Sequence, residues 1–127
     1  MSILSNVLAV GIGAALGAVA RWLLGLWLNH ATSTLPWGTL MANLVGAYLI
    51  GLALGCFLLF PETPGWMRLL VTTGFLGGLT TFSAFSAETV GLVERGEFLL
   101  AIGYSGLSLV GALVLTGLGL WTVNALR

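Results

Sequence analysis

The chain has 127 residues, of which 58% are hydrophobic and 6% charged, with four basic side chains, four acidic ones and no net charge. A soluble domain carries about 25% charged residues. The composition therefore excludes a soluble globular domain and predicts an integral membrane protein whose main solvent is lipid.

Four apolar segments are each long enough to cross a bilayer, which takes about 20 helical residues. Membrane β-barrels instead show segments of about 10 residues with alternating hydrophobicity, so these uninterrupted runs predict an all-α membrane protein. We expect the transmembrane helices at residues 3–28, 37–60, 66–93 and 98–126. Because they use nearly the whole sequence, we expect one four-helix membrane domain over residues 1–127.

The connections are short, at residues 29–36, 61–65 and 94–97, and the second contains two prolines that stop one helix and start the next. Short connections make consecutive helices antiparallel, so four crossings place both termini on one side of the membrane. No positively charged stretch and no cleavage site accompany the first segment, and we expect it to be retained as a span.

Small residues recur every fourth position in the first two spans, as Gly13-x-x-x-Gly17 and Ala47-x-x-x-Gly51-x-x-x-Gly55. This spacing lets helix backbones approach closely. It fits equally well packing within one subunit and a seam between two subunits. Arg21, near the end of the first span, has the pattern of an arginine whose charge reaches the membrane interface.

The third span carries the run GFLGGLTTFSAFSAE at residues 74–88. Each of its glycines weakens a helix by about 1 kcal/mol relative to alanine, and threonine hydroxyls compete for backbone hydrogen bonds. The run predicts a break near Gly74, Gly77, Gly78 and Thr80. Freed carbonyls in hydrocarbon are costly unless satisfied, and such carbonyls bind cations in several transporters. The alternative is a kink that serves packing.

Polar and aromatic side chains follow this break and occupy the neighbouring spans. Phe82 and Phe85 share one helical face, beside Ser83. One turn apart in the second and fourth spans lie the pairs Thr39 and Asn43, and Tyr104 and Ser108. Amide and hydroxyl donors can replace the water around an anion, and ring edges carry positive charge. These polar and aromatic side chains together predict a path for an anion. The alternative is that the aromatic rings only pack. The sequence pattern assigns no role to nearby Glu88.

The basic residues do not favour either orientation of the chain. Orientation follows the Lys/Arg bias of short loops, and here Arg68 and Arg127 flank one side while Arg21 and Arg95 flank the other. This balance predicts insertion in both orientations and pairing of two antiparallel copies. An unrecognised determinant that fixes one orientation is the alternative.

Other classes of protein fit the sequence less well. A small drug/proton antiporter needs a carboxylate in its first span, and residues 3–28 contain none. A scaffold subunit would leave the polar residues unexplained. The sequence has no nucleophile–base pair, metal cluster or phosphate-binding loop, so we do not expect an enzyme.

The run Gly-Gly-Leu-Thr-Thr-Phe-Ser-x-Phe-Ser in the third span resembles the signature of the CrcB/Fluc fluoride channels. Two further motifs agree, namely Gly-Thr-Leu-x-x-Asn-Leu-x-Gly at residues 38–46 and Arg21-Trp22 near the end of the first span. The resemblance covers essentially the whole chain. The sequence departs from the signature at Ala84, and many members carry a hydroxyl where it has Ala112.

This resemblance implies a multi-pass protein of the bacterial inner membrane that forms an antiparallel dual-topology homodimer with two pores. It implies passive export of fluoride, which lowers the cytoplasmic fluoride concentration and gives fluoride resistance. A structural sodium ion (Na+) is implied at the dimer centre, held by backbone carbonyls of Gly77 and Thr80. Fluoride, lipid and a second copy are the implied partners, without nucleic acid.

The resemblance, taken with the polar pairs, also assigns side chains to the ion path. The predicted fluoride pore residues are Asn43, Phe82, Phe85, Tyr104, Ser108, Thr39 and Ser83. Arg21 is placed near the vestibule, where its charge would gather anions.

Overall fold

The computed structural model describes residues 2–29 and 34–127. Within these ranges it contains helices and no strand, in the order α1 (Ile3–Leu28), α2 (Trp37–Leu59), α3 (Gly65–Arg68), η1 (Leu69–Leu76), α4 (Gly77–Leu79), α5 (Phe82–Glu94) and α6 (Phe98–Leu126). The segments α3 to α5 make up a single span, Gly65–Glu94. All four predicted spans are confirmed to within one residue. Residues 30–33 of the first predicted connection lie outside the described ranges.

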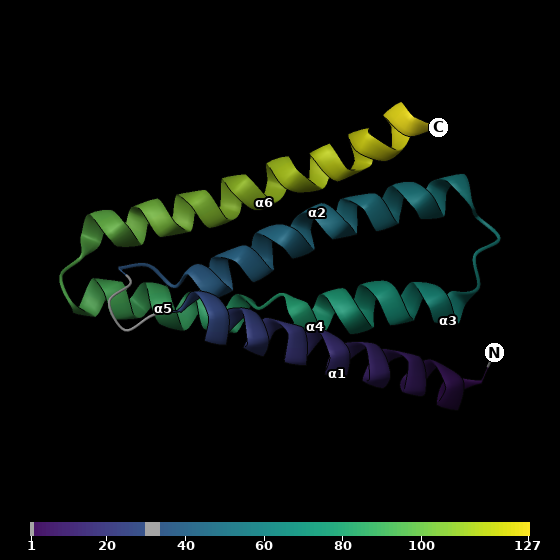
Figure 1. The fold of residues 1–127 in the computed structure, drawn as a ribbon, viewed down its shortest axis with the longest axis horizontal. Coiled ribbons are helices and arrows are strands. Elements are labelled where there is room, and N and C mark those ends of the chain that lie inside the picture. The colour runs from purple at the N-terminus through teal and green to yellow at the C-terminus, as the bar shows by residue number, and fades with distance from the viewer. Residues whose placement is uncertain (1, 30–33) are drawn as a thin grey trace.

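The chain runs back and forth along one axis, and both termini lie at the same end, as four crossings require (Figure 1). α2 packs mainly along α6, while α1 packs mainly along η1 and α4. The bundle is therefore built from two closely packed pairs of helices, joined by lighter contacts between α1 and α2 and between α5 and α6.

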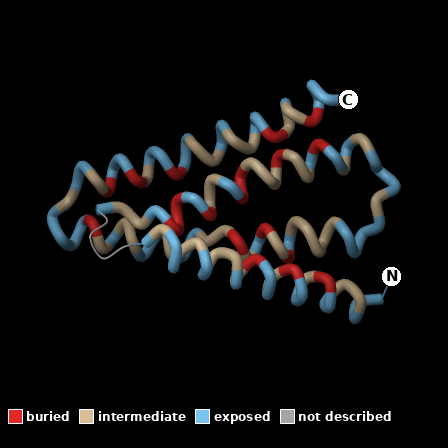
Figure 2. The backbone as a smooth tube through the Cα atoms, in the orientation of Figure 1, coloured by how far each residue is buried: buried red, intermediate tan, exposed pale blue. Residues whose placement is uncertain are grey.

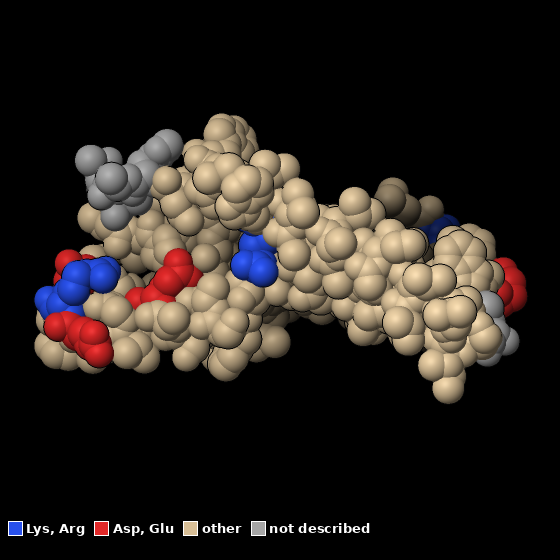
Figure 3. Space-filling view, turned by 90° about the horizontal axis from the view of Figure 1, so that it is seen from below, with Lys and Arg blue, Asp and Glu red and all other residues tan. Residues whose placement is uncertain are grey.

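The outer surface of the bundle is apolar. Buried positions lie where helices face one another, and much of the outward surface of α1 and α6 is exposed (Figure 2). Most of the face in Figure 3 carries no charge; charged side chains gather at its two ends, and one basic group lies near its middle. Exposed leucine, isoleucine, valine and tryptophan side chains suit contact with lipid and not with water.

The third span is interrupted, as predicted, but not at its glycines. Gly77 begins α4 with helical angles (φ −63°, ψ −37°), whereas Thr80 (φ −88°, ψ 155°) and Thr81 (φ −151°, ψ 116°) are extended. Preceding the break, η1 is a π-helix of eight residues. π-Helices are rare and are frequently found at functional sites, and nothing in the sequence analysis predicted this one.

The glycines of both small-residue motifs pack against other helices of the same chain. A methyl group on Gly17 would collide with the backbone of η1 and α4 at Phe75 and Leu79. A methyl group on Gly51 would collide with the α6 backbone at Thr116. Close backbone contact within the chain explains the glycines in both motifs.

We expect Gly17→Ala to lower the melting temperature of the detergent-solubilised protein, because overpacking a close helix contact costs about 1–3 kcal/mol. Gly11→Ala is the matched control in the same helix, since nothing lies within 4 Å of the added methyl group. Alanine at Gly11 should be neutral or slightly stabilising. Equal melting temperatures for the two variants would show that α1 does not pack this closely.

Candidate functional site

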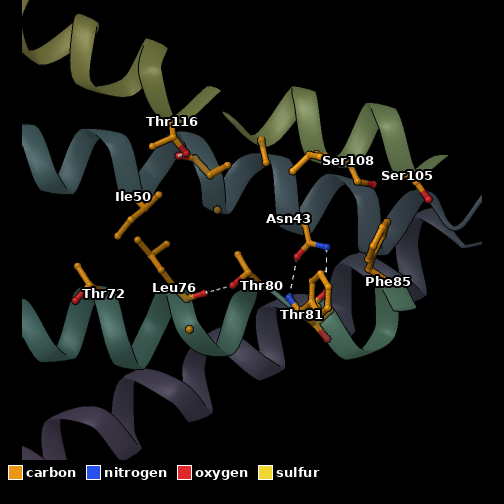
Figure 4. A pocket seen from close by; sticks show the side chains of 16 residues that line it. Asn43, Ile50, Thr72, Leu76, Thr80, Thr81, Phe85, Ser105, Ser108 and Thr116 are labelled. Carbon is orange, nitrogen blue, oxygen red and sulfur yellow. Dashed lines mark hydrogen bonds between the residues drawn. The ribbon is translucent and has the colours of Figure 1, made fainter. Parts of the chain in front are cut away.

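The break in the third span is braced by one side chain from α2. The Thr81 N–H donates to Asn43 Oδ1 at 2.7 Å, and Asn43 Nδ2 donates to the Thr81 carbonyl at 3.1 Å. Both backbone groups of the extended residue are thus satisfied by one amide (Figure 4). Asn43 was predicted as an anion donor, and one of its two N–H groups is committed to Thr81.

Two further side chains replace helical hydrogen bonds around the break. Thr81 Oγ1 accepts the Ala84 N–H at 3.1 Å and caps α5, as N-cap threonines do. The Arg21 Nε–H donates to the Gly78 carbonyl at 3.2 Å, at the C-terminal end of α4, where a cation is favourable. Arg21 therefore lies beside the break as well as near the end of α1.

The break removes the helical donors of several backbone carbonyls, those of Gly77 and Thr80 among them. In an uninterrupted α-helix each N–H bonds the carbonyl four residues earlier, so Thr81 would bond Gly77, and Ala84 would bond Thr80. Those two N–H groups bond the side chains of Asn43 and Thr81 instead. The carbonyls of Gly77 and Thr80, which the resemblance assigned to sodium, are the two acceptors released by this exchange.

A cavity of about 600 Å³ lies between α2, the third span and α6. We call it the central cavity, and it is bordered by Asn43, Gly77, Thr80, Phe82, Phe85 and Ser108. Figure 4 shows the side chains of Ser105, Ser108 and Thr116 from α6 lining it opposite Thr80. Sequence reasoning missed Ser105 and Thr116, although both continue the helical spacing of Ser108.

Aromatic rings form a row at one end of the central cavity. The ring centroids of Phe82 and Phe85 are 5.6 Å apart, and those of Phe85 and Tyr104 are 5.4 Å apart, with tilted planes in both pairs. Phe82 is 80% exposed in the single chain. Ser108 is only 9% exposed, and its hydroxyl has no hydrogen-bond partner among the described residues.

The hydroxyls of Thr39 and Tyr104 point at Glu88. Thr39 Oγ1 donates to Glu88 Oε2 at 3.1 Å, and the Tyr104 hydroxyl donates to Glu88 Oε1 at 3.5 Å. Both residues were predicted as anion donors, and neither borders the central cavity.

Two other predicted residues also lie outside the central cavity. Ser83 is exposed, and its hydroxyl lies 3.3 Å from Thr81 Oγ1. Arg21 borders a hollow of about 450 Å³ together with Thr39 and Asn29. Four of the predicted residues therefore border the central cavity, namely Asn43, Phe82, Phe85 and Ser108. The other four do not border it, namely Thr39, Tyr104, Ser83 and Arg21.

Comparison with known proteins identifies the family. A sequence model described as "CrcB-like protein, Camphor Resistance (CrcB)" matches residues 8–120. The chain belongs to the CrcB family. The resemblance seen in the third-span signature is confirmed by this match, which covers the break and all the residues predicted at the pore.

Several curated relatives in the CrcB family are similar over nearly their full length. A protein of Bordetella petrii is 66% identical over 122 residues, which is 96% of this chain and 94% of the relative. A protein of Bordetella bronchiseptica is 60% identical over 95% and 93% of the two chains, and one of Tolumonas auensis is 52% identical over 98% of each. Each is named "Fluoride-specific ion channel FluC". With its four spans, this chain is a multi-pass bacterial membrane protein.

We expect Asn43→Ala to destabilise the protein, because a partly buried polar group that loses its partner costs about 1–3 kcal/mol, and the Thr81 backbone would lose two hydrogen bonds. The melting temperature in detergent should fall well below that of the wild type. Asn124→Ala, which removes an exposed amide from α6, is the control and should change it little. Equal melting temperatures would mean that the amide does not brace the break.

Proposed function

We propose that this CrcB protein is a fluoride-selective passive ion channel and not an enzyme. The observation that carries the proposal is identity of 66% across 96% of the chain with a protein named as a fluoride-specific ion channel. The residue types around the central cavity support it, because short hydroxyls, an amide and phenyl edges are groups that stabilise a small anion.

Fluoride selectivity would arise from donors that replace its tightly held water. The Ser108 hydroxyl is free to donate to it, since it makes no hydrogen bond to the described residues. The second N–H of the Asn43 amide is likewise not used within those residues. The positive edges of Phe82 and Phe85 add further stabilisation. Chloride, being larger, would fit this narrow set of short side chains poorly.

Export follows from passive flow and weak-acid chemistry. Hydrogen fluoride crosses a bilayer as a neutral molecule and dissociates in the more neutral cytoplasm, which raises the concentration of fluoride inside. A passive channel then lets the trapped anion leave down its gradient. Such flow would lower cytoplasmic fluoride and provide resistance.

A second copy in the opposite orientation would complete the site. The central cavity leaves the Phe82 ring 80% exposed in one chain, and an aromatic ring at a pore needs a covering surface. The even division of arginines between the two sides permits both orientations. Two copies related by an axis in the membrane plane would form two pores.

The carbonyls of Gly77 and Thr80 fit a sodium ion between these copies. Both have lost their helical donors, and both residues border the central cavity. Two copies would supply four carbonyl oxygens, the kind of ligand that unwound membrane helices offer to sodium. When bound, the ion would supply the positive charge that offsets the cost of leaving these carbonyls without donors.

We expect Phe82→Ile and Phe85→Ile to slow fluoride efflux from proteoliposomes by about tenfold, equivalent to about 1.4 kcal/mol of lost stabilisation of the ion. A fluoride electrode measures the efflux, and chloride efflux is recorded in parallel. Phe98→Ile is the control, since this exposed ring at the start of α6 does not border the central cavity. Unchanged fluoride efflux in both pore variants would assign the rings to packing.

We expect sodium to raise the melting temperature of protein purified without it, because a ligand that binds only the folded state stabilises that state. The measurement compares sodium chloride with N-methylglucamine chloride at constant ionic strength. Stabilisation should increase with sodium concentration and then level off slowly. Identical melting temperatures in the two salts would exclude a structural sodium ion.

A further inference from the structure

Side chains from α2, α5 and α6 meet at Glu88, next to the central cavity. On α5, Phe85 borders the central cavity, and Glu88, one turn later, borders a separate hollow of about 380 Å³. We call this second space the end hollow, and Asn29, Leu92 and Arg95 also border it. Glu88 is therefore at the partition between the central cavity and the end of the molecule.

The other two helices reach the same partition. On α2, Asn43 borders the central cavity, while Thr39, one turn earlier, borders the hollow beside Arg21. On α6, Ser108 borders the central cavity, and Tyr104, one turn earlier, packs its ring on Phe85. At the partition, Thr39 and Tyr104 each donate a hydrogen bond to Glu88.

The carboxylate of Glu88 uses the donors that an incoming anion would need. Thr39 is 8% exposed and Tyr104 is 0% exposed, so no solvent competes strongly for their hydroxyls. A hydroxyl has a single hydrogen, and each of these two donates it to a different oxygen of Glu88. While both bonds are intact, neither group can donate to an ion that passes between the hollows.

The charged groups near Glu88 leave this arrangement in place. Arg95 borders the same end hollow, but its guanidinium lies 3.8 Å from the Glu97 carboxylate. Arg21 donates to the Gly78 carbonyl. A carboxylate within a membrane span is costly and usually functional, and among the described residues its close polar partners are two hydroxyls and no cation.

We propose that the Glu88 carboxylate, an anion fixed to the chain, gates the passage of small anions between the central cavity and the end hollow. The carboxylate holds the Thr39 and Tyr104 hydroxyls until a small anion displaces it, and it then turns into the end hollow. Fluoride competes for both hydroxyls because it is a strong hydrogen-bond acceptor, whereas chloride is a weaker one. This inference rests on the proposed passage of fluoride through the chain, and it makes Glu88 a positioning residue that also contributes to selectivity.

The test measures initial fluoride efflux against fluoride concentration in proteoliposomes. Glu88→Gln weakens the acceptor, and Glu88→Asp keeps the charge but is too short for both hydroxyls. Each change should lower the half-saturating fluoride concentration by about fivefold, as expected for losing about 1 kcal/mol of hydrogen bonding, without lowering the maximal rate. Glu94→Gln and Glu94→Asp are the matched controls on the same helix, where no hydroxyl of the described residues bonds the carboxylate, and should behave as wild type.

The outcomes separate the gate from simpler explanations. If Glu88→Asp matches the wild type and only Glu88→Gln differs, the residue acts through charge alone and the gate is overturned. Unchanged values in both variants overturn it too. If the wild-type protein passes no fluoride, the proposed function itself fails, and that result is distinct because it does not depend on any variant.

A spectroscopic measurement on the intact wild-type protein keeps the inference testable if the Glu88 variants do not fold. Infrared difference spectra should show that fluoride shifts a carboxylate stretching band, because the carboxylate loses two hydroxyl donors, and that chloride does not. The band shift should persist in Glu94→Gln. No fluoride-induced shift in the wild type, or an equal shift with chloride, would overturn the gate.

Discussion

Every backbone polar group in a membrane span needs a partner inside the protein, because lipid offers none. The break at Thr80 and Thr81 violates the helical solution to this constraint, and side chains restore most of what is lost. Asn43 satisfies both groups of Thr81, the Thr81 hydroxyl caps α5, and Arg21 bonds the Gly78 carbonyl. The repair leaves the carbonyls of Gly77 and Thr80 without their helical donors, so the same local geometry that interrupts the helix also favours a cation.

The tight packing of the bundle and the polar break depend on each other. Asn43 can bond Thr81 only because α2 and the third span lie within the reach of one short side chain. Glycines on α1 bring its backbone against η1 and α4, and this contact holds the first half of the span in place. The break is thus fixed by its neighbours, and the row of Phe82, Phe85 and Tyr104 follows from where α5 restarts.

Much of the fold could be predicted from the sequence, because membrane spans are set by length and hydropathy. The break was also predictable within the third span, near Thr80. Which residues of the run would stay helical was not predictable. Gly74 and Gly78 serve close packing against α1, and the Asn43 amide on α2 bonds the extended residue Thr81. The role of Asn43 in bracing Thr81, and the bonds of Thr39 and Tyr104 to Glu88, depend on the relative rotation of three helices. A single sequence carries no measure of that rotation.

The π-helix η1 has a consequence for how the two halves of the third span face the rest of the bundle. A π-turn accommodates an additional residue compared with an α-turn, and each residue of an α-helix turns the chain by about 100°. The eight residues of η1 therefore set the angular phase at which the chain enters the break. An ordinary α-helix in their place would present the carbonyl of Gly77 and the ring of Phe82 to different neighbours.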